Sequence, residues 1–300
     1  MLVDVAYSSS YLKWILGPDH PTNPQRARIC LELLEKRLPL RVVEPVASTV
    51  ESLSLVHDAD YVTRTFAGSN EEWSGERPDL GATAALMCGG TEVLARRILA
   101  GETRFGFNPQ GAKHHAMRAA GSGFCVFNDM AIAARLFVDA GWRVAYIDID
   151  AHHGDGVEEL LRDEPSVLTA SVHGSPLWPG TGLSSDADRA ALNWPVTADV
   201  QDDAWLVAVR EATEAARQWQ PDVVLAAIGA DAHVTDPLTS MQVTEAGYAE
   251  AGRVIGRAVA DLGVPVLVGG AGGYQPLTIT PAIWASVIAE IASARVSGSP

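Results

Sequence analysis

The chain has 300 residues, 47% of them hydrophobic and 20% charged, which is typical of a globular protein with a sizeable core. The formal net charge of -15 argues against non-specific binding to nucleic acid or to an anionic membrane surface. Three scattered cysteines make no disulfide framework, and the sequence contains neither a recognisable signal peptide nor an apolar run of about 18 residues. We therefore expect a reduced, cytoplasmic protein that binds neither nucleic acid nor membrane; its oligomeric state stays open.

Short apolar runs alternate with amphipathic stretches along the chain. The expected strands are Leu2–Tyr7, Val144–Ile149, Val167–Val172, Val223–Ile228 and Val264–Val268. The expected helices are Pro24–Lys36, Ala82–Ala100, Asn128–Ala140, Asp202–Trp219, Thr244–Leu262 and Pro281–Ala294. Apolar strands separated by helices predict a three-layer α/β fold, in which helices cover both faces of a mostly parallel sheet. No linker divides residues 1–300, so we expect a single domain with only the terminal SGSP frayed.

Ionisable or glycine-rich segments follow four of the expected strands. Asp150 and His152 follow the run that ends at Ile149, and His173 follows the next run. Asp231 comes after VVLAAIGA, and GGAGGY comes after the last strand. Because ligands of parallel α/β sheets bind outside the carboxyl ends of the strands, these segments predict one shared site.

The segment YIDIDAHHGDGVEE predicts a metal site. Alternate residues of a strand share a face, so Asp150 and His152 can project together as ligands of a divalent metal. An exposed acidic turn is the plainer alternative. Asp231 is the best third ligand, although His233 and Asp236 could compete. Two carboxylates and one imidazole leave positions open for water and substrate, which indicates a catalytic site; this set suits Zn²⁺ without excluding Fe²⁺ or Mn²⁺.

Two further groups could carry chemistry beside such a metal. The adjacent histidines His114 and His115 need carboxylate partners if they are to move protons, and Asp148 and Asp155 are the two spare carboxylates. The loop GGAGGY matches no nucleotide-binding signature but presents Tyr274, whose hydroxyl could donate to a developing oxyanion. For a lone tyrosine, packing is the plainer alternative.

Ten segments in the same order resemble the histone deacetylase superfamily, particularly the bacterial acetoin-utilisation-type deacetylases. They are HPTNPQR, HDADYV, FNPQGAKHHAM, SGFCVFND, DIDAHHGDGVEE, VLTASVH, PGTG, PDVVLAAIGADAH, DPL and GGAGGY, and they extend from His20 to Tyr274. The resemblance implies the arginase-deacetylase fold and a zinc-dependent amidohydrolase. Its substrate would be an acylated amine, such as acetyl-lysine, an acetylpolyamine or an N-acetylated small metabolite.

The resemblance also implies a role for each matching residue. His115, paired with Asp155, would be the general base that deprotonates the attacking water. His114, paired with Asp148, would stabilise the tetrahedral state, and Tyr274 would polarise the amide carbonyl. The implied zinc ligands are Asp150, His152 and Asp231. The implied channel residues are Gly123, Phe124, Trp178 and Leu238. The implied structural K⁺ site consists of Asp148, Asp150, His152, Ser171 and Val172.

The chain departs from the family pattern in four places. Trp178 stands where Phe is common, and GAK precedes His114 where eukaryotic members commonly read PPG, although GAK is nearer the bacterial GGL. The segment after PGTG is short, and SGERPDLG, near the expected substrate-gripping loop, does not align. These differences concern the choice of substrate rather than the catalytic groups.

Two other functions compete with a deacetylase. Arginase-like ureohydrolases share the fold but hold two metals with an Asp-x-Asp segment, whose second position is His233 here. An inactive module that binds acetylated groups is the other alternative. Metal counting would identify the first, and turnover of an acetyl-lysine reporter would exclude the second.

Overall fold

A computed structural model of the chain describes residues 1–18 and 20–294, so the terminal SGSP lies outside the described residues. Its centre is an eight-stranded sheet with the strand order β2-β1-β3-β8-β7-β4-β5-β6, and all neighbouring strands run parallel. The strands are β1 (Val3–Ala6), β2 (Leu40–Val43), β3 (Phe105–Asn108), β4 (Val144–Asp148), β5 (Val167–Ser175), β6 (Ala191–Thr197), β7 (Val223–Ile228) and β8 (Val266–Gly270).

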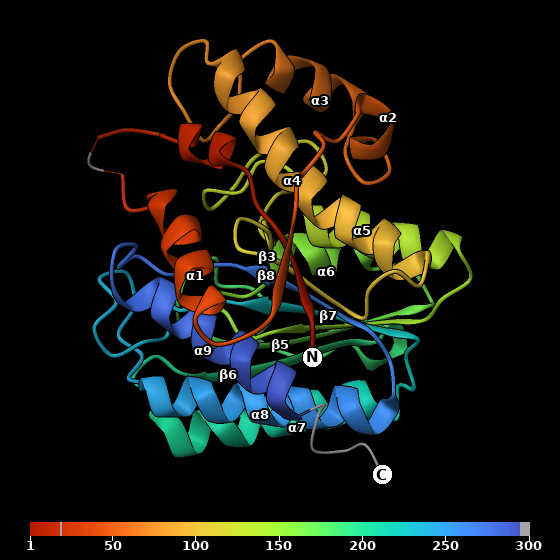
Figure 1. Cartoon of the computed structure of the whole chain (residues 1–300), viewed down its shortest axis with the longest axis vertical. Coiled ribbons are helices and arrows are strands. Elements are labelled where there is room, and N and C mark those ends of the chain that lie inside the picture. Colours follow the sequence, from red (N-terminus) through yellow and green to blue (C-terminus); the bar gives the residue numbers. More distant parts are fainter. Residues whose placement is uncertain (19, 295–300) are drawn as a thin grey trace.

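Helices connect the strands and cover the sheet. They are α1 (Gln25–Glu35), α2 (Val50–Leu53), α3 (Ala59–Phe66), α4 (Pro78–Leu99), α5 (Asp129–Asp139), α6 (Asp155–Leu161), α7 (Asp202–Gln218), α8 (Glu245–Leu262) and α9 (Ile279–Ala294), with short 3₁₀ turns at Ser9–Lys13 and Ala187–Arg189. Figure 1 shows α7, α8 and α9 on one side of the sheet and α4 and α5 on the other. No helix within the described ranges is long and apolar enough to cross a bilayer.

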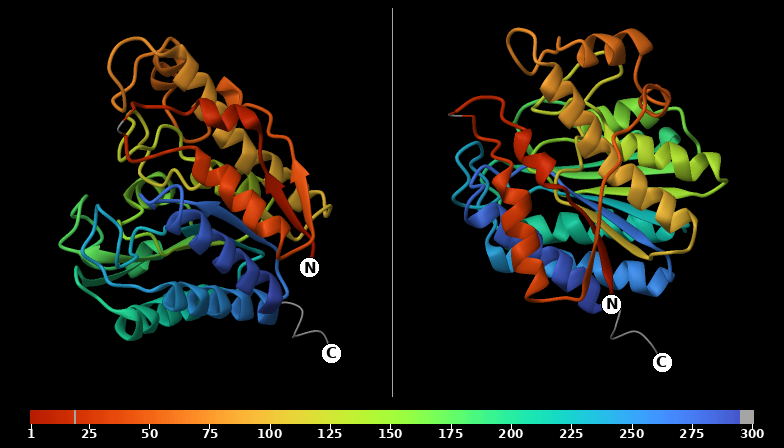
Figure 2. Two further views of the ribbon diagram at one scale, coloured as in Figure 1. Left: turned by 60° about the vertical axis from the view of Figure 1, so that its left-hand side comes forward. Right: turned by 45° about the horizontal axis from the view of Figure 1, so that its top comes forward.

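The sheet separates two hydrophobic cores, and the alternation of strand residues creates both. Ala145 and Ile147 of β4 face the core formed with α1, α7, α8 and α9. Val144 and Tyr146 of the same strand face the core formed with α4, α5 and α6. Because successive side chains of a strand point to opposite faces, a strand apolar at every position is buried on both sides. The expected three-layer α/β fold is therefore confirmed, and the side views show the layers edge-on (Figure 2).

The expected strands and helices are all present, Val223–Ile228 with the expected ends and the others with shifted ends, but several short elements were missed. The edge strand β2 is partly exposed and carries no continuous apolar run. The opposite edge strand, β6, contains Pro195. Proline in a sequence argues against a strand, although edge strands tolerate it. The inner strand β3 has only four residues, too few for a periodic pattern. The segment SGERPDLG begins α4, with Pro78 in the first helical turn, where the missing N–H is not needed.

Candidate active site

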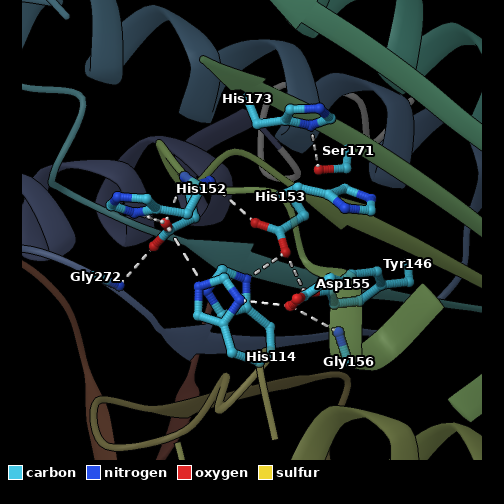
Figure 3. Close-up of polar contacts among 12 residues, drawn as sticks. His114, Tyr146, His152, His153, Asp155, Gly156, Ser171, His173 and Gly272 are labelled. Atoms are coloured by element: carbon cyan, nitrogen blue, oxygen red, sulfur yellow. Dashed lines mark hydrogen bonds and ion pairs between the residues drawn. The ribbon is translucent and has the colours of Figure 1, made fainter. Parts of the chain in front are cut away.

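Three ionisable side chains, among them His152 (Figure 3), converge just beyond the carboxyl ends of β4 and β7. Nδ1 of His152 lies 3.2 Å from Oδ1 of Asp150 and 3.0 Å from Oδ2 of Asp231. Ligand atoms around a tetrahedral zinc ion lie about 3.3 Å apart, given bonds of about 2.0–2.2 Å to nitrogen and carboxylate oxygen. The spacing and the donor types therefore fit one divalent metal ion, held by the three residues expected from the sequence.

Backbone register and two glycines bring the carboxylates together. Asp148, the last residue of β4, pairs with Ala227, one residue before the end of β7. The segments that follow the two strands therefore lie side by side. A Cβ atom at Gly272 would lie 2.1 Å from a carboxylate oxygen of Asp231, and one at Gly229 would lie 2.2 Å from Asp150. Only glycine leaves room for both carboxylates, which explains the glycines that follow β7 and β8.

The charges of this group favour a bound cation. Asp150 and Asp231 are 1% and 0% exposed, so bulk water does not solvate the negative charge of either carboxylate. Burial and the charge of Asp150 raise the pKa of Asp231. Burial alone would lower the pKa of His152, but its hydrogen bonds to the two carboxylates raise it to about 11. Even with His152 protonated, the two buried carboxylates leave a net negative charge, which a divalent ion would offset.

The adjacent histidines each have their own carboxylate partner, as the sequence suggested. Nδ1 of His114 lies 2.7 Å from Asp148, Nδ1 of His115 lies 2.7 Å from Asp155, and the two rings are 3.9 Å apart. Burial lowers the pKa of His114, yet the charges of Asp148 and Asp150 outweigh it and raise this pKa to about 9. Burial and the charge of His114 hold the pKa of His115 well below its usual value. Near neutral pH the pair therefore consists of one imidazolium and one neutral imidazole.

The residues expected to bind K⁺ lie at or just after the end of β4 and in the middle of β5. Asp148 is opposite Ser171 in the strand register, and Val172 follows on the same strand. The hydroxyl of Tyr146 donates to Asp148 at 2.5 Å, and the hydroxyl of Ser171 lies 2.9 Å from Nδ1 of His173. The structure thus brings these residues together, while part of their hydrogen-bonding capacity is already used by neighbours (Figure 3).

The two residues that could have competed with Asp231 as metal ligands have other partners. Nδ1 of His233 lies 2.9 Å from the hydroxyl of Thr235. The carboxylate of Asp236 accepts the backbone N–H groups of Tyr274 at 2.8 Å and of Leu238 at 2.9 Å. Asp236 therefore connects the loop that presents Tyr274 to the loop that presents Leu238.

A cavity of about 410 Å³ leads from the surface to His152. All four channel residues expected from the sequence line it, and the full lining is Glu72, His115, Gly123, Phe124, His152, Trp178, Leu238 and Tyr274. The ring of Trp178 lies 4.6 Å from that of His115, and the ring of Phe124 lies 5.9 Å from that of Tyr274. A Cβ atom at Gly123 would lie 2.6 Å from both His115 and Trp178, so glycine is required between them.

Three residues of this region were missed in the sequence. Glu72 lines the channel and accepts the backbone N–H of Phe124 at 2.7 Å, and burial raises the pKa of its carboxyl group. Arg26 and Lys113 line a smaller cavity behind the site. Burial and the charge of Arg26 lower the pKa of Lys113 to about 8. The only sequence signal was that Arg26 lies in HPTNPQR and Lys113 in the unusual GAK; Glu72 lies in a segment that matched nothing.

Comparison with known proteins gives consistent results. A family model described as the histone deacetylase domain matches residues 20–291. The acetoin utilization protein AcuC of Bacillus subtilis (strain 168) is 35% identical, over 95% of this chain and 81% of that protein. A probable deacetylase of Archaeoglobus fulgidus is 30% identical, over 83% of this chain and 75% of that protein. The crystal structure of the HDA15 HD domain has a TM-score of 0.85 and 27% sequence identity, and the match covers 98% of this chain and 89% of that chain.

Proposed function

This chain belongs to the histone deacetylase family, and on that premise we propose that it is a zinc-dependent amidohydrolase that removes an acetyl group from an amine. The family supports a deacetylase acting on an acylated amine. The observation that carries the zinc-dependent mechanism is the convergence of Asp150, His152 and Asp231 at the inner end of the channel, beside two His–Asp pairs.

In this proposal Asp150, His152 and Asp231 hold one Zn²⁺ ion. When bound, the ion acts as a Lewis acid toward the scissile carbonyl and makes water a better nucleophile at neutral pH. The same donor set would accept Fe²⁺, and K⁺ would occupy the site at Asp148 and Ser171.

The other residues of the site divide the proton transfers between them. Neutral His115 takes a proton from the attacking water and gives it to the amine nitrogen when the C–N bond breaks, and Asp155 keeps its ring in the orientation and tautomer that this requires. His114, as an imidazolium held by Asp148, stabilises the negative charge that develops on the former carbonyl oxygen. The phenol of Tyr274 donates to the same oxygen; burial, with the nearby carboxylates, raises its pKa well above its usual value and so keeps it protonated.

The channel suggests the shape of the substrate. Phe124 and Trp178 are aromatic lining residues, which suit an unbranched methylene chain that ends in the amide. Acetyl-lysine, an acetylpolyamine and an N-acetylated small metabolite all have this shape. We propose that one catalytic domain, residues 1–300, acts on such a substrate in the cytoplasm.

A panel of amides tests this function. Metal-depleted protein, with and without one equivalent of Zn²⁺ or Fe²⁺, would be assayed against acetyl-lysine peptides, acetylpolyamines and N-acetylated metabolites. We expect turnover only in the metal-loaded forms, with one metal ion per chain in the catalytic site. Two tightly bound catalytic metal ions together with urea-forming activity would indicate an arginase-like enzyme instead. Binding of the amides without turnover would indicate an inactive binding module.

A further inference from the structure

A small cavity behind the metal group continues the channel inward. Its volume is about 20 Å³. It shares His115, Gly123, Phe124 and Tyr274 with the wide channel, so these four residues stand between the two spaces. An amide whose amine part fills the channel, and whose carbonyl is next to Tyr274, would direct its acyl group into this cavity.

The cavity has room for a very short acyl group. A cavity needs about 10–15 Å³ to hold one water molecule, so this one accommodates a single group of roughly the size of water or a methyl. The methyl of an acetyl group would fit. Each additional methylene would have to displace a side chain of the wall.

Lys113 is one of the residues that line this cavity, and it is 7% exposed. The backbone cannot easily retreat, because the N–H groups of Ala112 and Lys113 donate to the buried carboxylate of Asp129 at 2.9 and 2.7 Å. Ala112 is also in the left-handed region, with φ of 50°, a conformation that the clamp by Asp129 maintains. The side chain of Lys113 is therefore the part of this segment that can change the size of the cavity.

The charge of the cavity wall, like the small volume of the cavity, disfavours longer acyl groups. Arg26 is 3% exposed, its Nη1 donates to the carbonyl of Gly273 at 3.1 Å, and its Nε has no partner among the described residues. Within residues 1–18 and 20–294 no carboxylate forms an ion pair with Arg26 or with Lys113. A longer alkyl group would place hydrocarbon against two buried cations, which is unfavourable.

We propose that Lys113 is a specificity-determining residue that limits the acyl group to acetyl. This inference rests on the proposed function, because it concerns the acyl side of the same reaction. It predicts that a smaller or uncharged residue at position 113 extends the reaction to longer acyl groups.

The test compares acetyl, propionyl and butyryl amides of one amine in the wild type, Lys113→Ala and Lys113→Met. Lys113→Ala removes both bulk and charge, whereas Lys113→Met keeps most of the length and removes the charge. We expect the ratio of kcat/KM for butyryl to that for acetyl to rise at least ten-fold in Lys113→Ala, and less in Lys113→Met. Leu238→Ala, at the outer part of the channel, is the control, and should change kcat/KM for all three amides by the same factor.

Binding without turnover separates this inference from the proposed function. In metal-loaded Tyr274→Phe, calorimetry should detect the acetyl amide but not the butyryl amide, and adding Lys113→Ala should restore butyryl binding. A wild type that hydrolyses none of the amides would contradict the proposed function, while the binding comparison would still decide the role of Lys113. An unchanged ratio in folded, metal-loaded Lys113 variants would overturn the inference. So would a wild type that hydrolyses butyryl or succinyl amides as fast as acetyl amides; the succinyl result would show that Arg26 and Lys113 bind a carboxylate.

Discussion

Nδ1 of His115 lies 2.7 Å from Oδ1 of Asp155, the same distance that separates Nδ1 of His114 from Oδ2 of Asp148. The two pairs are nevertheless in different protonation states. Burial and the charge of its neighbour hold the pKa of His115 well below its usual value, whereas nearby carboxylates overcome burial and raise the pKa of His114 to about 9. Asp148 contributes most to raising the pKa of His114, and the carboxylate of Asp150, 3.8 Å from His114, adds to it, whereas the charge of His114 lowers the pKa of His115.

Asp155→Asn should lower kcat about 10- to 100-fold, since the loss of a carboxylate that orients a functional histidine has this typical effect. The bound metal should be retained, because Asp155 is not a proposed ligand. Asp163→Asn is the matched control: its side chain is 87% exposed and lies outside the channel lining, so kcat should not change. Steady-state kinetics and metal analysis of both variants test this, and an unchanged kcat in Asp155→Asn would contradict the assignment of His115 as the base.

Tyr274→Phe should keep the fold and the metal but lose turnover. One hydrogen-bond donor to an oxyanion contributes about 2.7–4 kcal/mol, equivalent to roughly 10²- to 10³-fold in kcat. Tyr7 does not line the channel, so Tyr7→Phe serves as the control. Near-native kcat in Tyr274→Phe would show that Tyr274 is only a packing residue.

Asp231→Asn and His152→Ala should each abolish metal retention and activity, because either change leaves two protein ligands of the proposed three. His233→Ala is the control: His233 is close to Asp231 in sequence but has Thr235 as its partner, so it should keep one metal ion per chain. Metal analysis after desalting measures the outcome. Stoichiometric zinc in Asp231→Asn or His152→Ala would refute the ligand assignment.

As the pH falls, this site should release its metal at a higher pH than a site made of exposed carboxyl groups would. Burial and the charge of Asp150 raise the pKa of Asp231, so its carboxylate takes up a proton at a higher pH than an exposed Asp does. Protons and metal compete for the same ligand atoms, so bound zinc keeps these groups deprotonated to a pH below their metal-free pKa; retention should be complete near neutral pH and be lost as the pH falls further. Zinc content after dialysis over a series of pH values measures this. Asp236→Asn, which leaves the three ligands intact, should release zinc over the same range.

Substrates branched next to the scissile carbonyl should be rejected, because the acyl group must enter a space of about 20 Å³. Trp178 is 50% exposed, and its ring lies 6.1 Å from that of His152, so it narrows the channel above the metal group. Trp178→Phe should therefore increase kcat/KM for acetyl-lysine peptides. Measured kcat/KM values for acetyl and isobutyryl amides test whether branched acyl groups are rejected. Equal values would contradict so narrow a space for the acyl group.

Much of the catalytic site could be predicted from local sequence patterns. Asp150 and His152 are two residues apart at the end of an apolar strand, and period-two alternation places them on one side. Asp231 and Tyr274 follow other apolar strands, whose carboxyl ends meet at one edge in a parallel sheet. The pairing of His114 with Asp148 and of His115 with Asp155 required the family resemblance in addition, because four groups allow more than one pairing.

Tertiary structure alone revealed the inner cavity and the place of Glu72 in the outer channel. Glu72 reaches the channel from the loop before α4, and Arg26 meets Lys113 although 86 residues lie between them in the sequence. The short strand β3 leads to Lys113, yet its four residues carry no period that a sequence pattern could reveal. Sequence periodicity determines which face of a strand or helix a side chain occupies. The size of a cavity depends instead on how closely distant segments pack, and that is a property of the folded chain.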